Sequence, residues 1–155
     1  MKLPLILLAF IFIPFLGCES SENVCEEIQP IVLDFSNLED VVIESEEKED
    51  NFLVINSEDE FLNKVSISIN NQNNFNPFDI NFSESTLLIG KVRLAGIEGQ
   101  KLEERVELCE SGRTEYILKI KNGGYAAIGL FYFGVIIPKT MEENVVFNIS
   151  VSSNN

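Results

Sequence analysis

The stretch YAAIGLFYFGVIIP, residues 125–138, is the strongest indicator of the fold of this chain. No charged residue lies between Lys121 and Lys139, which leaves two interpretations, a membrane segment or a buried strand. The stretch is short for a membrane-spanning helix, which needs roughly 20 apolar residues. It also contains Gly129 and Gly134, and its aromatic and β-branched residues favour a strand. We therefore predict a central strand that is buried on both faces.

The segments around this stretch also have strand patterns. The sequence TLLIGKVRLA, residues 86–95, alternates apolar positions with Lys91 and Arg93. Residues 102–108, 114–121 and 145–151 alternate in the same way, which is the period of a half-buried strand. The tripeptide Asn-Gly-Gly that follows residue 121 is the strongest turn signal, because glycine readily takes positive φ. These strands predict an antiparallel meander that closes as a sandwich or a partly closed barrel.

The upstream half of the chain predicts shorter elements. Strands are expected at residues 31–35, 41–43, 52–55 and 79–82. One short helix is expected near residues 57–65. Its start carries a capping box, in which Ser57 accepts from the N–H of Glu60 and Glu60 reaches back to Ser57. The fold class is therefore mainly β, either all-β or α+β.

The N-terminal sequence MKLPLILLAFIFIPFLGC, residues 1–18, has the features of an export signal. A basic tip at Lys2 precedes an apolar run, and the small residue Gly17 follows that run. A cysteine placed directly after the small residue resembles the signal of bacterial lipoproteins, with Phe15 at the usual aliphatic position. The resemblance implies that Cys18 is acylated, with palmitate among its acyl chains, and becomes the mature N-terminus.

Two alternatives to this lipoprotein signal are a simple secreted signal and an uncleaved transmembrane anchor. The apolar run is short for crossing about 30 Å of hydrocarbon. Pro4 and Pro14 also disfavour a regular helix through it. We therefore expect an exported protein, lipid-anchored in the bacterial cell envelope at the outer membrane. Whether it faces the periplasm or the outside stays open.

Length and charge restrict the domain organisation and the function of the remainder of the chain. The lipoprotein signal peptide at 1–18, which ends in the acylated Cys18, is followed by an acidic tether at 19–30 and one β-rich domain at 31–155. The chain has 25 acidic and 11 basic residues, and its net charge of −14 makes nucleic-acid binding an improbable function. Solubility explains this charge more simply than a cationic or metal-ion partner does.

Two cysteines remain after Cys18, namely Cys25 and Cys109. Export places both in an oxidising compartment, where a Cys25–Cys109 disulfide can form. The alternative is that Cys109 is a buried free thiol. Sequence alone leaves these two possibilities open, because the distance between the two residues is set by the fold.

The amino-acid composition gives little support to an enzymatic function. The chain has no histidine, which excludes Ser-His-Asp and Cys-His catalysis and His-containing zinc sites. Carboxylate pairs remain at Glu103-Glu104, at Asp59-Glu60 and in the acidic run 44–50, which could in principle serve glycoside hydrolysis or calcium binding. We expect a solvated charged surface instead, with no catalytic residue, no metal ligand and no cofactor.

Part of the chain resembles a known family. The sequence DINFS at residues 79–83, followed by TLLIG at 86–90, resembles the opening of PrcB-type domains. Three later segments are similar to the closing strands of that family, at residues 124–125, 127–129 and 137–139. PrcB-type domains occur in small bacterial lipoproteins, including an accessory component of a surface protease complex. The resemblance implies an all-β or α+β domain without catalytic residues, which is often of unknown function and in some members is an assembly partner for a protease.

These observations lead to one principal expectation of function. We expect a membrane-tethered, non-enzymatic lipoprotein of the cell envelope that acts as a protein-interaction or assembly domain. Its partners would be the membrane, through the lipid anchor, and a second protein. A protease is one candidate for that protein. The alternative is a carboxylate-based hydrolase that acts on envelope polymers, and a third possibility is an exported inhibitor or chaperone of a protease.

Overall fold

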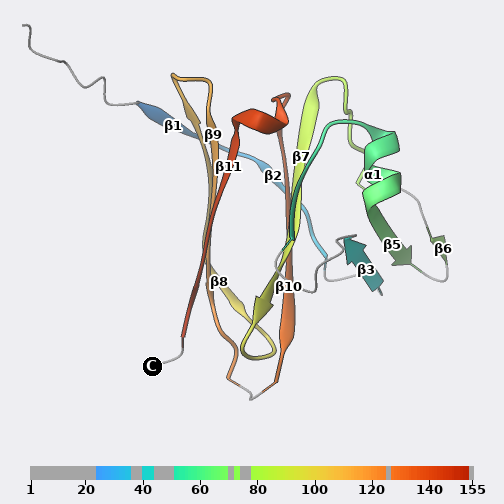
Figure 1. The fold of residues 1–155 in the computed structure, drawn as a ribbon, viewed down its shortest axis with the longest axis vertical. Helices are drawn as coiled ribbons and strands as arrows, with labels where there is room; N and C mark the ends of the chain where they lie inside the picture. The colour runs from blue at the N-terminus through green and yellow to red at the C-terminus, as the bar shows by residue number, and fades with distance from the viewer. Residues whose placement is uncertain are drawn as a thin grey trace, which may run out of the picture.

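The computed structural model describes residues 24–35, 40–43, 51–69, 72–73, 78–124 and 127–153. These residues form three layers (Figure 1). Two four-stranded sheets, sheet A and sheet B, stack as a sandwich, and the third layer combines one helix with the small sheet C. The structure therefore confirms a mainly β fold with antiparallel-rich sheets and one α-helix, arranged as a sandwich.

The elements belong to the layers as follows. Sheet A has the order β1-β8-β9-β11 and contains β1 (Cys25–Ile28), β8 (Gln100–Cys109), β9 (Thr114–Lys121) and β11 (Val145–Ser152). Sheet B has the order β2-β10-β7-β4 and contains β2 (Ile31–Val32), β10 (Gly129–Pro138), β7 (Ser85–Leu94) and β4 (Asn51–Ile55). Sheet C contains β3 (Asp40–Ile43), β5 (Val65–Ile69) and β6 (Gln72–Asn73). The helix α1 spans Glu58–Lys64, and a 3-10 turn, η1, spans Glu142–Asn144.

Two hydrophobic cores lie on either side of sheet B. The sandwich core, between sheets A and B, is made of the buried residues Val54, Leu88, Val92, Leu94, Val106, Tyr116, Leu118, Ile120, Phe133, Val135 and Ile137. The flank core, between sheet B and the third layer, is made of the buried residues Ile43, Ile55, Phe61, Val65, Ile67, Leu87 and Ile89. Burial of each such side chain stabilises the fold by about 1.5–3 kcal/mol, so hydrophobic burial stabilises sheet B on both of its faces.

Strand β10 is the predicted central strand, and the structure confirms that both of its faces are covered. It pairs with β7 over ten residues. Phe133 and Val135 belong to the sandwich core, whereas Tyr132 and Ile136 pack against the flank core. The continuous apolar sequence is thus required by burial on two sides. No helix in the described part of the chain is long and apolar enough to cross a membrane.

The pairing of β11 departs from the predicted antiparallel meander. β11 pairs with β9 in parallel, from Val145 opposite Thr114 to Ser152 opposite Lys121. β10 runs along sheet B in the opposite direction, so the chain re-enters sheet A, after η1, at the end where β9 began (Figure 1). The strand pattern in the sequence specifies which side chains face inward, but it carries no information about which strand becomes the neighbour.

Residues 79–82, predicted as a strand, do not form one, and a turn at 82–84 follows before β7 starts. Asn81 accepts from the Ser83 N–H at 3.2 Å and from the Ser83 hydroxyl at 2.7 Å. Its carbonyl accepts from the Glu84 and Ser85 N–H groups at 3.1 and 3.0 Å. Ile80 and Phe82 both pack against the flank core, which explains why apolar and polar residues alternate here without an extended strand.

The predicted acidic tether at 19–30 is also partly wrong. Residues 19–23 lie outside the described residues, but Cys25–Ile28 is strand β1 and pairs with β8. Of the predicted strand at 31–35, only Ile31–Val32 pairs as a strand, and Leu33 adds one hydrogen bond to the Gly134 carbonyl at 2.9 Å. The structured domain thus begins before residue 31, because pairing with β8 orders a segment whose own sequence is polar.

The helix prediction is confirmed, with one change in the cap. Ser57 accepts from the Glu60 N–H at 3.2 Å, as the capping box requires. Glu60 does not return this bond to Ser57, since its carboxylate accepts from the Asn56 N–H at 3.0 Å and from Lys64 at 2.6 Å. The helix ends at Lys64 because Val65 is already extended and starts β5.

Candidate functional site

Cys25 and Cys109 form a disulfide, which agrees with the predicted pair and excludes a free Cys109. Their sulfur atoms lie 2.05 Å apart, and the two residues face each other directly in the β1–β8 register. The backbone continues the pairing beyond them, since the Glu110 N–H donates to the Val24 carbonyl at 3.0 Å. The disulfide therefore fastens the first described residues to the turn between β8 and β9.

One carboxylate lies close to this disulfide. The ligand atoms of Cys25, Cys109 and Glu115 all lie within 4.8 Å of one another. Both sulfur atoms are used in the disulfide bond, and metal ions bind the thiolate form of cysteine. Glu115 itself is engaged by Arg113 and by the Asn148 side chain, which donates at 2.8 Å. The cluster therefore provides no metal site while the disulfide is intact.

A pocket of about 230 Å³ opens beside the disulfide, between the ends of sheets A and B. Its lining residues are Leu108, Cys109, Gly112, Arg113, Thr114, Pro138, Lys139 and Thr140. Both of its cations have partners in the protein. Arg113 pairs with Glu115, and Lys139 donates at 2.7 Å to each of the Asn56 and Phe82 carbonyls. These two side chains therefore link neighbouring segments at this end of the sandwich.

A buried threonine completes the polar contacts at this end. Thr86 is fully buried, and its hydroxyl donates to the Asn56 side chain at 2.7 Å. The same hydroxyl accepts from the Thr140 N–H at 2.9 Å. These bonds connect the end of β4, the start of β7 and the segment after β10. Their role is structural, because a buried hydroxyl without partners would be costly.

The two acids of the predicted pair Glu103-Glu104 make separate sets of contacts. Glu103 pairs with Arg105 and with Lys119, whose Nζ lies 2.6 Å from its carboxylate, among the charged side chains of β8 and β9. The hydrogen bond from Lys119 lowers the pKa of Glu103, and Arg105 adds to this effect against the opposing effect of burial. Arg105 also donates to Glu107 at 2.8 Å. These groups neutralise one another along the strands.

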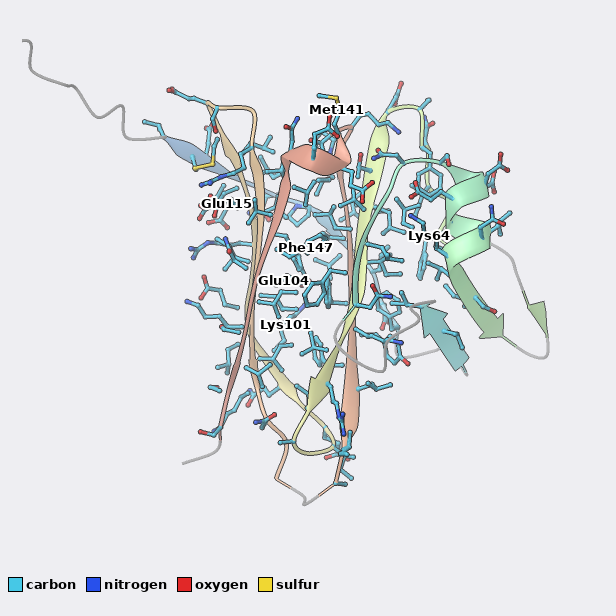
Figure 2. The ribbon with its side chains drawn as sticks, viewed as in Figure 1. Lys64, Lys101, Glu104, Glu115, Met141 and Phe147 are labelled. Carbon is cyan, nitrogen blue, oxygen red and sulfur yellow. A yellow bond between two sulfur atoms is a disulfide. The ribbon has the colours of Figure 1, made fainter. Side chains whose placement is uncertain are left out.

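Glu104 instead meets the sandwich core (Figure 2). Its carboxylate accepts from the Tyr116 hydroxyl at 2.7 Å and pairs with Lys101, and its side chain is only 5% exposed. Burial, reinforced by the bond to Glu104, raises the pKa of Tyr116 well above its usual value, so Tyr116 stays protonated and donates. The alternation of β8 places Glu104 on the same face as Val106, but its contact with Tyr116 depends on the β8–β9 register, in which Tyr116 lies opposite Val106.

The other predicted acids show no opposed arrangement either. Glu60 is held by Lys64 and the Asn56 N–H, while the neighbouring Asp59 is exposed on the first turn of α1. The acidic run at 44–50 lies outside the described residues, as do Cys18 and the whole signal peptide at 1–18. A glycosidase needs two carboxyl groups that face each other across a cleft, and the pairs at 103–104 and 59–60 do not have that geometry.

Comparison with other proteins gives no relative for this chain. No protein-family model, no curated protein and no solved structure matches it.

Proposed function

We propose that this protein is a non-enzymatic lipoprotein of the bacterial cell envelope, held at the outer membrane, whose domain binds another protein. One observation carries the proposal, the N-terminal signal in which Gly17 and Cys18 follow an apolar run. The resemblance to PrcB-type domains adds a protease as the class of partner. The contacts of Glu103, Glu104 and Glu60 give no support to the alternative of a carboxylate-based hydrolase.

The position of β1 makes this tether short. Residues 19–24 separate Cys18 from Cys25, which is bonded to Cys109. An extended chain advances at most about 3.3–3.6 Å per residue, so the seven steps from Cys18 to Cys25 cover at most about 25 Å. An acylated Cys18 would therefore hold the disulfide end of the sandwich close to the membrane. A partner would have to bind at the membrane surface.

The anchor is tested by replacing its cysteine. The Cys18→Ala variant should lose palmitate labelling and move from the membrane fraction to the soluble fraction, because acyl chains supply the attachment. The domain should still fold, which retention of the Cys25–Cys109 bond in a non-reducing digest would show. A Ser20→Ala variant serves as the matched control and should stay in the membrane. A Cys18→Ala protein that remains labelled and membrane-bound would contradict the proposal.

Partner binding is tested in intact cells with an amine-reactive crosslinker. The wild-type protein should yield a specific crosslinked partner protein after solubilisation in mild detergent. The Cys18→Ala variant, released from the membrane, should yield much less of that product. If the wild-type protein and the variant give the same background and no common partner, the interaction role is wrong. If a partner is found that is not a protease, the binding role stands and only the predicted class of the partner is wrong.

A further inference from the structure

Strand β11 forms an edge of sheet A that lacks the usual protection against further pairing. Among the described residues, only β9 pairs with it, so its other side is open. Its sequence VVFNISVS contains no charged residue and no proline over eight residues. Its register with β9 runs from Val145 to Ser152 without a shift. Natural edge strands are usually shortened, charged, bulged or interrupted by proline, and none of these devices occurs in β11.

The other edge strands of the sandwich are better protected. β1 has four residues, two of them glutamates, and is held by the disulfide. β2 has only two residues. β4 has five residues and is followed, after Asn56 and Ser57, by helix α1. Of the four edge strands in sheets A and B, β11 is therefore the one whose edge lacks such protection among the described residues.

The backbone groups on this open edge can be assigned from the pairing. The Ser152 carbonyl accepts from the Asn122 N–H at 2.9 Å, so Ser152 points its backbone groups toward β9. Successive residues of a strand direct these groups to alternate sides. The N–H and C=O groups that point away from β9 accordingly belong to Val145, Phe147, Ile149 and Val151.

We propose that the open edge of β11 binds the same edge of a second copy of this chain, antiparallel and about a two-fold axis at Asn148. In this register Val145 pairs with Val151 of the second copy, and Phe147 pairs with Ile149. All four outward-directed residues thus make reciprocal hydrogen bonds, and two four-stranded sheets become one sheet of eight strands. An isologous contact of this kind closes on itself and does not propagate.

The charges along the edge favour a second copy in this orientation. Glu142 and Glu143 in η1 lie at the start of β11, and both are exposed. Lys121 is exposed opposite Ser152, at the other end of the strand. Figure 1 shows η1 and the far end of β11 at opposite ends of the sandwich. Antiparallel pairing brings the acidic end of each copy toward the basic end of the other.

The net charge of −14 does not prevent this contact. The nearest glutamate, Glu115 of β9, is engaged by Arg113 and by the Asn148 side chain. The glutamates of β8 lie two strands behind β11, and strands are spaced about 4.8 Å apart, which places them about 14 Å from the second copy's strand. Salt at physiological strength screens charges beyond about 8 Å. The two copies of β1 would lie at opposite edges of the eight-stranded sheet. Lipid anchors on both copies would therefore reach one membrane only if the strands lie along its surface.

The proposal is tested with an engineered cysteine at the axis. Asn148 is exposed and directs its backbone groups toward β9, so the two copies of this residue form a non-hydrogen-bonded pair with Cα atoms about 4.5 Å apart. That separation suits a disulfide. The Asn148→Cys protein, in membranes and oxidised with copper phenanthroline, should run at twice the monomer mass on a non-reducing gel. The matched control is Asn63→Cys, at an exposed position on α1, which should stay monomeric.

A second variant separates edge pairing from chance collision. Val151→Pro removes one outward N–H and leaves the bonds to β9 in place, which is where an edge strand tolerates proline. Combined with Asn148→Cys, it should abolish the dimer band, whereas Val151→Ala should keep it. The proposal is overturned if Asn148→Cys gives no more dimer than Asn63→Cys, if Val151→Pro leaves the dimer unchanged, or if Asn148→Cys crosslinks only to other proteins. Circular dichroism with a native-like melting curve establishes that each variant is folded.

Discussion

Gly90 shows at the scale of one residue how the two sheets constrain the sequence. It lies in the middle of β7, where a side chain would normally add to the core. A Cβ atom here would lie 2.5 Å from the Asn51 carbonyl oxygen and 2.5 Å from the Phe133 ring. Phe133 is the cross-strand partner of Gly90, so the ring fills the space that the glycine leaves. The glycine is therefore required by packing.

Replacing this glycine should destabilise the fold. We expect Gly90→Ala to lower the free energy of unfolding by about 1–3 kcal/mol, the usual cost of overpacking. Urea denaturation followed by circular dichroism measures this change. The matched control is Gly124→Ala, because a Cβ at Gly124 meets nothing within 4 Å. Equal unfolding midpoints for the two variants would show that Phe133 moves aside at little cost.

Glu60 links the start of α1 to the pH dependence of stability. Burial opposes its ionisation, but the hydrogen bonds from Lys64 and the Asn56 N–H, with the charges of Lys64 and Lys139, outweigh burial and lower the pKa of Glu60 from 4.5. A carboxyl whose pKa is lower in the folded state stabilises the fold above the unfolded value. That contribution is lost as the pH falls below about 4.5 and passes through the folded pKa.

The corresponding experiment compares Glu60→Gln with the wild-type protein. The wild-type protein should lose more stability than the variant between pH 5 and pH 3, roughly the range in which this carboxyl takes up its proton. Thermal unfolding at a series of pH values measures the difference. Asp59→Asn is the control, since Asp59 is exposed beside Glu60. Parallel pH profiles for wild type and Glu60→Gln would mean that the ion pair with Lys64 contributes nothing.

At the scale of elements, the disulfide links β1 covalently to β8 of sheet A. β1 is a four-residue edge strand with two glutamates, which is a weak strand by composition. Cys25 and Cys109 are separated by 84 positions in the sequence, so their bond removes much of the freedom of the unfolded chain. The strand is thus retained by a covalent link and four register pairs with β8.

Removing this link should have a large effect on stability. The double variant Cys25→Ser, Cys109→Ser should lose about 3–5 kcal/mol of unfolding free energy, as expected for a loop of this length. The wild-type protein under reducing conditions should lose a similar amount, which urea titration with and without reductant measures. Hydrogen exchange should show the larger part of the lost protection in β1. Unchanged midpoints after reduction would mean that non-covalent pairing alone holds β1.

At the scale of the whole molecule, the two large sheets have different environments. Sheet B lies between two cores, and this explains why β7 and β10 have apolar residues on both faces. β9 of sheet A has alternating burial, with Tyr116 and Leu118 buried and Lys119 exposed. Charged pairs such as Lys119 with Glu103 follow from that exposure. The three-layer arrangement thus accounts for both types of strand in the sequence.

Local sequence was sufficient to predict the strands with a regular alternation, the strand buried on both faces, the cap of α1 by Ser57 and the pair of cysteines that can bond. These features depend on local spacing, on hydrophobicity and on the number of cysteines, all of which can be read along the chain. The signal ending at Cys18 is of the same kind, and it remains a prediction.

Tertiary packing established the parallel pairing of β9 with β11, the packing of residues 79–82 against the flank core without a strand, the strand at Cys25–Ile28 and the contact of Glu104 with Tyr116. Each of these depends on which distant segment becomes the neighbour. A strand pattern specifies an inward face, but backbone hydrogen bonds can be satisfied by any adjacent strand. The choice of neighbour comes from packing two cores against one shared sheet, and among the described residues it leaves β11 paired on one edge only.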